Sequence, residues 1–313
     1  MKSKNLIHEI NLISKLFDVG NFVFEKKLKS QSAQNPSSLY IFCDPTGRKY
    51  FVKLVQFTSK REFVYKHLKK EAELLKMFAG LGGRCKSKIY FASQVRFKQQ
   101  GNSLVLITKY IRADELEKFP KNIKIVFLGN VLDYLENLTL ILTKKEVALL
   151  PKKSNLFIFG VFHYYFFTFI FKNPRQVLRA LQFLTVFYQS IFNSGQIFRT
   201  KYTVSHRDLH SKNILVKGKK TYLIDLDNCA MCPVNNDLAM MPGYFYKELD
   251  KSYILNFITN RLGSVFENKR FLYLLVFYFF VKQKTESKLS YFYIESNEYA
   301  NFINSLIEGL KIV

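Results

Sequence analysis

The sequence predicts an α+β protein of two lobes, an N-lobe with an antiparallel sheet and one main helix and a C-lobe that is mainly helical. Two observations predict this class. The chain has 313 residues, more than a single hydrophobic core usually organises. Short β-rich runs dominate up to Arg112, and long helical patterns dominate after it. We therefore expect domains over residues 1–112 and 113–313.

In the first domain, apolar residues at helical spacing predict helices over residues 5–17 and 59–78. The sequence Asp44-Pro45-Thr46-Gly47 is a typical turn between two β-rich runs, and it predicts a hairpin that carries Lys53. The expected strands of this domain cover residues 21–28, 39–43, 50–55 and 104–111.

In the second domain, a helix is expected over residues 174–194, with proline at its start and glycine after its end. Two strongly apolar segments, 156–171 and 271–281, are shorter than the roughly 20 residues that a membrane span requires. Buried helices are therefore predicted for both. The first segment also suits an anchor lying in a membrane surface, because it is rich in aromatics and flanked by lysines.

Basic residues greatly outnumber acidic ones, since Lys+Arg 48 and Asp+Glu 24 give a net charge of +24. Such a charge attracts an anionic partner, either nucleic acid or a membrane surface. The codon bias of an AT-rich genome explains the same composition without any partner. No nucleic-acid recognition motif accompanies the charge, so we expect no specific nucleic acid. Codon bias and an anionic membrane surface both stay open.

The four cysteines, Cys43, Cys85, Cys229 and Cys232, are too few to cross-link a chain of this length. Polar residues interrupt the apolar start of the chain, which argues against a secretory signal. We therefore expect a cytoplasmic protein, with peripheral attachment to the inner face of the membrane as the second possibility. Cys229 and Cys232 have CxxC spacing, but zinc would need two more ligands and none stand near in the sequence.

The residues that can carry chemistry lie in SHRDLHSKNILV (205–216) and YLIDLD (222–227). A turn at Gly218 predicts a hairpin that places Asn213 and Asp225 side by side, roughly 5 Å apart between their Cβ atoms. Two oxygen ligands at this spacing suit Mg²⁺, which takes its other ligands from water and phosphate. Asp208 stands five residues before Asn213 and can face the same site.

These segments resemble the catalytic and metal-binding loops of protein-kinase-like phosphotransferases, in which H-R-D-L-x-x-x-N is followed by D-F-G. The resemblance implies that Asp208 accepts the hydroxyl proton or orients the nucleophile, and that Asn213 and Asp225 hold Mg²⁺. It also implies that Lys53, in FVKL, binds the phosphates of ATP and pairs with an acidic residue of the next helix. Glu71 is the expected partner, and Glu73 is its rival.

Three departures indicate a kinase of small molecules. His210 replaces the lysine of serine/threonine protein kinases and is expected at the nucleotide with Lys53 and Glu71. The IDLD sequence is similar to that of bacterial lipopolysaccharide kinases, which act on Kdo or heptose. Few residues separate Asp225 from Asp237, so the long peptide-docking segment of protein kinases is missing. Asp237 resembles the aspartate that braces the catalytic loop in aminoglycoside phosphotransferases, although it could equally be a plain helix cap.

No G-x-G-x-x-G sequence lies between the first two strands, so either residues 30–38 replace the usual phosphate-binding loop or no segment does. We expect an ATP- and Mg²⁺-dependent kinase acting on a sugar hydroxyl of a lipopolysaccharide-type glycolipid. Another small-molecule kinase, a Ser/Thr protein kinase and a catalytically weak pseudokinase are the alternatives.

Overall fold

The computed structural model describes residues 2–17, 22–28, 37–56, 62–81, 89–194, 201–286 and 295–312. The chain forms two compact units. The first contains Met1–Asp114 and Leu215–Asn228, and the second contains Glu115–Ile214 and Cys229–Val313. The sequence pattern suggested one division near Arg112 and did not indicate that residues 215–228 return to the first unit.

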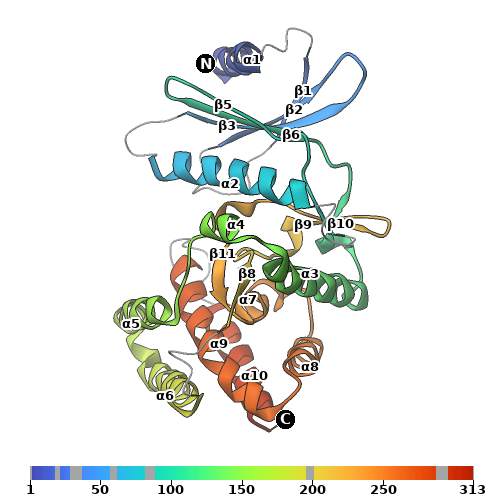
Figure 1. Cartoon of the computed structure of the whole chain (residues 1–313). Coiled ribbons are helices and arrows are strands. Elements are labelled where there is room, and N and C mark those ends of the chain that lie inside the picture. Colours follow the sequence, from blue (N-terminus) through green and yellow to red (C-terminus); the bar gives the residue numbers. More distant parts are fainter. Residues whose placement is uncertain are drawn as a thin grey trace. The chain divides into compact units, whose positions relative to one another are not determined.

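The first unit is built on a five-stranded antiparallel sheet in the order β1-β2-β3-β6-β5 (Figure 1). The predicted turn joins β2 to β3, and Gly47 in it has a φ of 79°, which favours glycine. The antiparallel sheet of the predicted fold class is therefore confirmed. Its strands are β1 (Val23–Leu28), β2 (Ser38–Cys43), β3 (Lys49–Gln56), β5 (Arg96–Gln100) and β6 (Ser103–Lys109).

Helices α1 (Lys2–Phe17) and α2 (Glu62–Gly80) cover opposite faces of this sheet (Figure 1). Ile13 and Leu16 of α1 are buried in one cluster with apolar side chains of β2, β3 and β6. Side chains alternate between the two faces of a strand. Val52 belongs to the cluster under α1, so its neighbour Lys53 projects to the face that α2 covers.

A second sheet has the order β4-β10-β9-β7, and its strands β4 and β10 are parallel. The predicted hairpin corresponds to β9 and β10, with Gly218 at a φ of 58°. The strands are β4 (Ile89–Phe91), β7 (Asp114–Glu115), β9 (Ile214–Lys217) and β10 (Lys220–Leu223). A short 3-10 helix, η6 (Leu226–Asn228), follows this hairpin.

The second unit is mainly helical, as predicted. Its helices are α3 (Lys121–Ile141), α4 (Lys144–Ala148), α5 (Asn155–Lys172), α6 (Val177–Ser194), α7 (Asn236–Phe245), α8 (Lys251–Leu262), α9 (Val265–Glu286) and α10 (Glu295–Ile312). Strands β8 (Tyr202–Ser205) and β11 (Ala230–Pro233) form an antiparallel pair. Short 3-10 helices are η3 (Leu116–Lys118), η4 (Pro174–Gln176) and η5 (Ser211–Asn213).

The two apolar segments behave differently. Every residue of α9 from Phe271 to Phe280 is buried, as expected for a central helix that is apolar all round. The prediction of a buried helix is therefore confirmed for 271–281 and wrong for 156–171. Helix α5 buries only one stripe of side chains and exposes large apolar residues such as Phe167 and Phe171 on its other face.

Candidate active site

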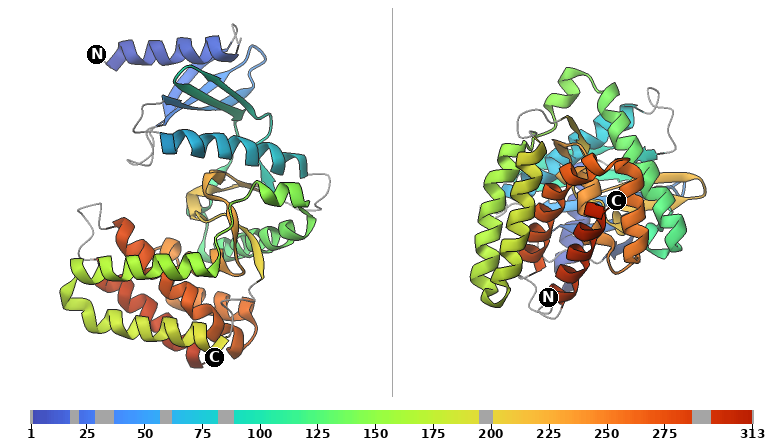
Figure 2. Two further views of the ribbon diagram at one scale, coloured as in Figure 1. Left: turned by 60° about the vertical axis from the view of Figure 1, so that its left-hand side comes forward. Right: turned by 90° about the horizontal axis from the view of Figure 1, so that it is seen from below.

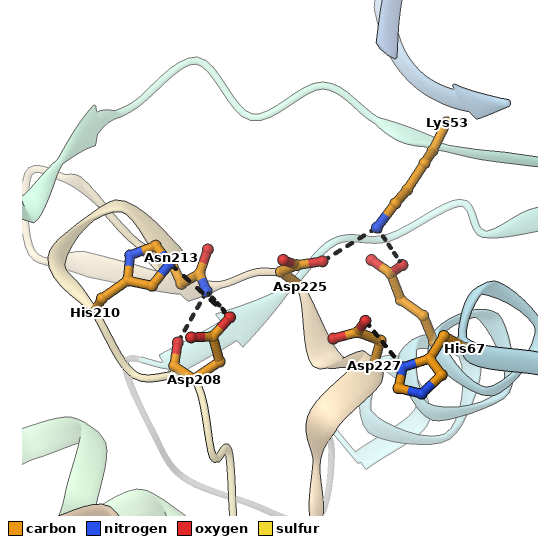
Figure 3. Close-up of polar contacts among 8 residues, drawn as sticks. Lys53, His67, Asp208, His210, Asn213, Asp225 and Asp227 are labelled. Atoms are coloured by element: carbon orange, nitrogen blue, oxygen red, sulfur yellow. Dashed lines mark hydrogen bonds and ion pairs between the residues drawn. The ribbon is translucent and has the colours of Figure 1, made fainter. Parts of the chain in front are cut away.

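Lys53 is the centre of a buried polar cluster in the first unit. Its Nζ lies 2.9 Å from Glu71 Oε2 and 3.1 Å from Asp225 Oδ1 (Figure 3). Strand alternation aims Lys53 at α2, and helical periodicity places Glu71 on the inner face of α2 beside Ala72 and Leu75. Glu73 is exposed. The structure thus pairs Lys53 with Glu71 and not with Glu73.

The charges in this cluster do not balance. Burial opposes the positive charge of Lys53, but Glu71 and Asp225 outweigh burial and raise the pKa of Lys53. Burial, together with the negative charges of Asp225 and Asp227, raises the pKa of Glu71 to about 7 despite the nearby ammonium group. The two shifts have different main causes, because neighbouring carboxylates act on Lys53 and burial acts first on Glu71, but the carboxylates of Asp225 and Asp227 contribute to both. An additional cation would therefore be stabilised here.

Asp227 brings a second carboxylate to the cluster. Its Oδ2 lies 3.2 Å from His67 Nδ1, and its backbone oxygen accepts a hydrogen bond from Lys70 Nζ at 2.8 Å. Burial acts to raise the pKa of Asp227, but the hydrogen bond with His67 and the charge of Lys53 hold it below its usual range. Asp227 Oδ1 is buried and has no hydrogen-bond partner among the described residues.

These carboxylates fit Mg²⁺. The side chain of Asp225 is 38% exposed, so it is accessible to a ligand. Buried polar atoms normally have a hydrogen-bond partner, so the unsatisfied Oδ1 of Asp227 is available to coordinate a cation. Across the described ranges, no set of three or more His, Cys, Asp or Glu residues could hold a metal ion. Mg²⁺ suits such a site, because it needs only one or two carboxylates and takes water and phosphate oxygens for the rest.

Asp208 lies in the loop between β8 and η5 of the second unit, where three side chains approach it. Asn213 Nδ2 donates to the backbone oxygen of Asp208 at 2.8 Å and to its Oδ2 at 3.4 Å (Figure 3). Tyr244 Oη donates to Asp208 Oδ1 at 3.1 Å. His210 Nε2 is 4.0 Å from Asp208 Oδ2, and His210 Nδ1 accepts from the backbone N–H of Lys212 at 3.2 Å.

Asp237 holds the start of this loop from the first turn of α7. Its carboxylate accepts three hydrogen bonds, each of 2.8 Å, from Ser205 Oγ and from the backbone N–H groups of His206 and Arg207. Arg207 has a φ of 63°, a left-handed conformation that a non-glycine residue adopts only where its surroundings enforce it. Asp237 therefore braces the loop that carries Asp208.

Asp225, in the predicted metal-binding segment, also has a left-handed conformation, with a φ of 61°. The residue follows β10 with only Ile224 between them. In the second unit, Asn213 directly precedes β9. Their predicted closeness across the hairpin stays a prediction, as do the roles of Lys53, Glu71, Asp208, His210, Asn213 and Asp225.

His67, Lys70 and Tyr244 were missed by sequence reasoning. His67 and Lys70 lie one helical turn and one residue before Glu71, so the helical period could have placed them near the carboxylates. No sequence signal distinguishes Tyr244 from the other tyrosines. The expected phosphate-binding loop at residues 30–38 lies mostly outside the described residues.

Residues 179–272 match a family described as "Phosphotransferase enzyme family". This segment contains both loops that the sequence predicts to be catalytic. No curated protein sequence matches the chain significantly.

Solved structures with similar folds are aminoglycoside-type phosphotransferases. The GDP complex of aminoglycoside 2'-phosphotransferase-IIIa is 14% identical, with 98% of each chain covered and a TM-score of 0.64. The spectinomycin phosphotransferase complex with ADP and spectinomycin is 14% identical, with 97% of this chain and 96% of that chain covered and a TM-score of 0.54. An aminoglycoside phosphotransferase from Alicyclobacillus acidocaldarius is 11% identical, with 96% of each chain covered and a TM-score of 0.57.

The predicted fold class is thus confirmed, and the family match covers the segment in which the catalytic loops were predicted. The chain therefore has a fold similar to that of the aminoglycoside phosphotransferases, and its residues 179–272 are similar to a family of phosphotransferase enzymes.

Proposed function

We propose that this kinase transfers the γ-phosphoryl group of ATP to a hydroxyl group of a sugar, carried by a lipopolysaccharide-type glycolipid. The observation that carries the proposal is the buried Lys53, held between Glu71 and Asp225 at hydrogen-bond distance. A lysine fixed in this way is suited to binding phosphate oxygens, because two carboxylates set its position and keep it charged. A buried ion pair contributes little net stability, because the cost of desolvation offsets the attraction between its charges, so stability alone does not account for this cluster.

Each cluster has a role in this reaction. In the first unit, Lys53 binds phosphate oxygens and Asp225 holds Mg²⁺, with Asp227 as a further oxygen donor. In the second unit, Asp208 accepts the proton of the attacking hydroxyl, Asn213 holds the Asp208 loop, and His210 lies beside both. When bound, Mg²⁺ neutralises the negative charge of the transferring phosphoryl group.

The similar structures support a small-molecule acceptor. The spectinomycin phosphotransferase was solved with ADP and spectinomycin, and another structure of the group was solved with AMP-PNP and hygromycin B. The 2'-phosphotransferase was solved with GDP, so GTP belongs in the test beside ATP. The short connection from Asp225 to Asp237, which leaves no peptide-docking segment, supports the same class of acceptor.

The IDLD sequence at 224–227 is the observation that favours a glycolipid over a soluble aminoglycoside. We place such an enzyme in the cytoplasm, at the inner face of the membrane, where its acceptor would lie. The basic excess of the chain agrees with an anionic surface there.

The test is a panel of acceptors with labelled ATP or GTP, containing Kdo- and heptose-bearing glycolipids, aminoglycosides and a generic protein substrate. We expect transfer to a glycolipid only, and at least about a hundredfold less transfer by Asp208→Asn, the scale of a lost positioned base. Phosphorylation of aminoglycosides alone would contradict the glycolipid acceptor and assign aminoglycosides as the acceptor class. Absence of turnover with every acceptor, ATP hydrolysis included, would favour a pseudokinase.

Nucleotide binding is measured separately through the melting temperature. Mg²⁺ with ATP should raise the Tm of the wild type by mass action, and Asp208→Asn should keep this shift. Asp225→Ala should lose it. A wild type without any Mg²⁺-dependent shift at saturating ATP and GTP would contradict the nucleotide site itself.

A further inference from the structure

Helices α5 and α6 lie side by side along one edge of the second unit (Figure 2). The buried stripe of α5 repeats every three or four residues, as does an exposed stripe that contains no polar or charged side chain except the hydroxyl of Tyr164. Helix α6 adds further exposed apolar residues, with the exposed polar residues Gln182, Thr185 and Gln189 among them. The α5–α6 face is defined by Leu156, Phe157, Tyr164, Phe167, Phe171, Leu178, Leu181 and Phe192.

Several residues of this face are strongly exposed. Phe171 is 83% exposed, Leu178 80% and Phe192 68%. Single exposed apolar residues are ordinary in soluble proteins, but a row of them at helical spacing along one face of α5 indicates an interaction surface. We therefore expect a partner that offers apolar groups to contact these side chains.

The opposite side of α5 is fixed within the protein. The ring of Phe162 stacks on Phe187 of α6 with 3.6 Å between centroids, and it meets the edge of Phe280 of α9 at 5.5 Å. By length and composition α5 could cross a membrane, yet its buried stripe belongs to the core of the second unit. A helix held in this way can enter a membrane surface only sideways, with its exposed stripe.

The charge around the face identifies the kind of partner. From Val147 to Arg207 the sequence contains no Asp or Glu. Basic residues stand at both ends of α5, namely Lys152 and Lys153 before it, Lys172 as its last residue and Arg175 after it. Lys153 Nζ lies 4.4 Å from the ring centroid of Phe157, so a cation borders the apolar stripe directly. This combination complements acyl chains beneath anionic headgroups.

We propose that the α5–α6 face docks on an anionic lipid surface, with α5 and α6 in the plane of the membrane. The assignment deepens the proposed function, because a glycolipid acceptor lies at such a surface. The membrane-facing element is then the pair of helices α5 and α6. A second copy of the chain fits less well, since it would bring Lys172 and Arg175 near their equivalents without acidic residues from 147–207 to pair with them.

The first experiment uses the absence of tryptophan from the sequence, where Trp is 0. Phe171→Trp introduces one fluorophore into the face, and Val126→Trp introduces one at an exposed position of α3, 60% exposed in the wild type. With vesicles of phosphatidylcholine and phosphatidylglycerol, we expect a blue shift for Phe171→Trp and quenching by lipids brominated in the upper acyl chain. Val126→Trp should show neither.

The second experiment measures co-sedimentation of the full chain with the same vesicles. We expect Phe167→Gln with Phe171→Gln to weaken binding by at least about tenfold, because two rings leave the acyl region. The matched control, Ile123→Gln with Val126→Gln, removes exposed apolar groups from α3 and should bind like the wild type. Circular dichroism and Tm establish that each variant is folded.

The third experiment tests the charges. Lys172→Gln with Arg175→Gln should weaken binding at about 0.05 M salt and have little effect at about 0.5 M, where such charges are screened. The control, Lys217→Gln with Lys219→Gln, removes exposed lysines near the β9–β10 turn of the first unit and should bind normally. Equal losses in both pairs would indicate unspecific attraction and contradict the proposed face.

Two further outcomes would overturn the proposal. One is a wild type that does not bind anionic vesicles. The other is a wild-type dimer in light scattering that Phe167→Gln with Phe171→Gln converts to monomers, with equal vesicle binding by both proteins, because the face would then join two copies. All of these assays need no nucleotide or turnover. Their failure is therefore distinguishable from failure of the kinase proposal.

Discussion

The hydroxyl group of Tyr244 donates a hydrogen bond to the carboxylate of Asp208, with 3.1 Å between Tyr244 Oη and Asp208 Oδ1. Burial and the negative charge of Asp208 raise the pKa of Tyr244 well above its usual value, so the phenol stays protonated and remains a donor. Asn213 holds the same loop through the backbone oxygen of Asp208. Tyr244 and Asn213 thus hold Asp208, the proposed base, through two separate hydrogen bonds within the second unit.

Tyr244→Phe should therefore lower kcat by about tenfold while leaving the KM for ATP nearly unchanged, because a hydrogen bond to a charged group is lost without a change at the nucleotide. Steady-state kinetics at saturating acceptor measure the effect. Tyr253→Phe, at an exposed position of α8, is the matched control and should behave like the wild type. A higher KM for ATP with an unchanged kcat would assign Tyr244 to another role.

Glu71→Gln should weaken phosphate binding by Lys53. The substitution removes one of the two carboxylates that hold the ammonium group, so kcat/KM for ATP should fall by roughly one to two orders of magnitude. The Tm shift produced by Mg²⁺ and ATP should decrease in parallel. Glu73→Gln removes an exposed carboxylate two residues away and should change neither quantity. Equal effects of the two substitutions would contradict the Lys53–Glu71 pairing.

Glu9 should make stability depend on pH. Burial acts to raise the pKa of Glu9, but hydrogen bonds from Tyr40, Lys27 and Ser38 outweigh burial and hold it below its usual value. A lowered native pKa stabilises the fold above the unfolded value near 4.5, and this contribution is lost as the pH falls through the native pKa.

Glu9→Gln should therefore destabilise the protein by about 1–2 kcal/mol at pH 7, the cost of weakened charge-assisted hydrogen bonds. The difference from the wild type should shrink below about pH 4. Urea unfolding at several pH values measures it. Glu308→Gln, on the exposed side of α10, provides the control. A difference that grows in acid would show that the pKa is shifted in the opposite direction.

Cys232 should be unreactive in the native protein. Burial raises the pKa of its thiol to about 12. Cys229, which precedes it in the CxxC sequence, is also buried. Only the thiolate reacts with iodoacetamide. At pH 8 both residues should stay unmodified in peptide maps until urea unfolds the chain. Modification of either residue in the folded protein would revive a redox or metal role for the CxxC sequence.

Much of this architecture was predictable because its signals are local. Turn residues predicted the hairpin that carries Lys53, which the structure contains. Polar residues at fixed spacing pointed to Asp208, Asn213 and Asp225, whose roles stay predictions. The choice of Glu71 over Glu73 also followed from a sequence pattern, and the structure pairs Lys53 with Glu71.

The rest depends on tertiary packing that no local pattern encodes. Tyr244 reaches Asp208 from α7, 36 positions along the chain. The apolar composition of residues 156–171 predicts burial, yet only one stripe of α5 finds partners in α6 and α9. The return of residues 215–228 to the first unit likewise follows from the pairing of β10 with β4, which are far apart in the sequence.

The burial of every side chain from Phe271 to Phe280 has a consequence for mutational screens. A helix without a solvent-facing side tolerates neither charged nor much smaller residues, since each leaves a cavity or an unsatisfied polar group. In random libraries screened for phosphorylation, many inactive clones will therefore carry substitutions in this stretch. These clones are inactive because the protein does not fold, and not because a site residue has changed. Scoring protein abundance beside activity separates these clones from true catalytic variants. Positions that lose activity at normal abundance are the ones that will define where the acceptor binds.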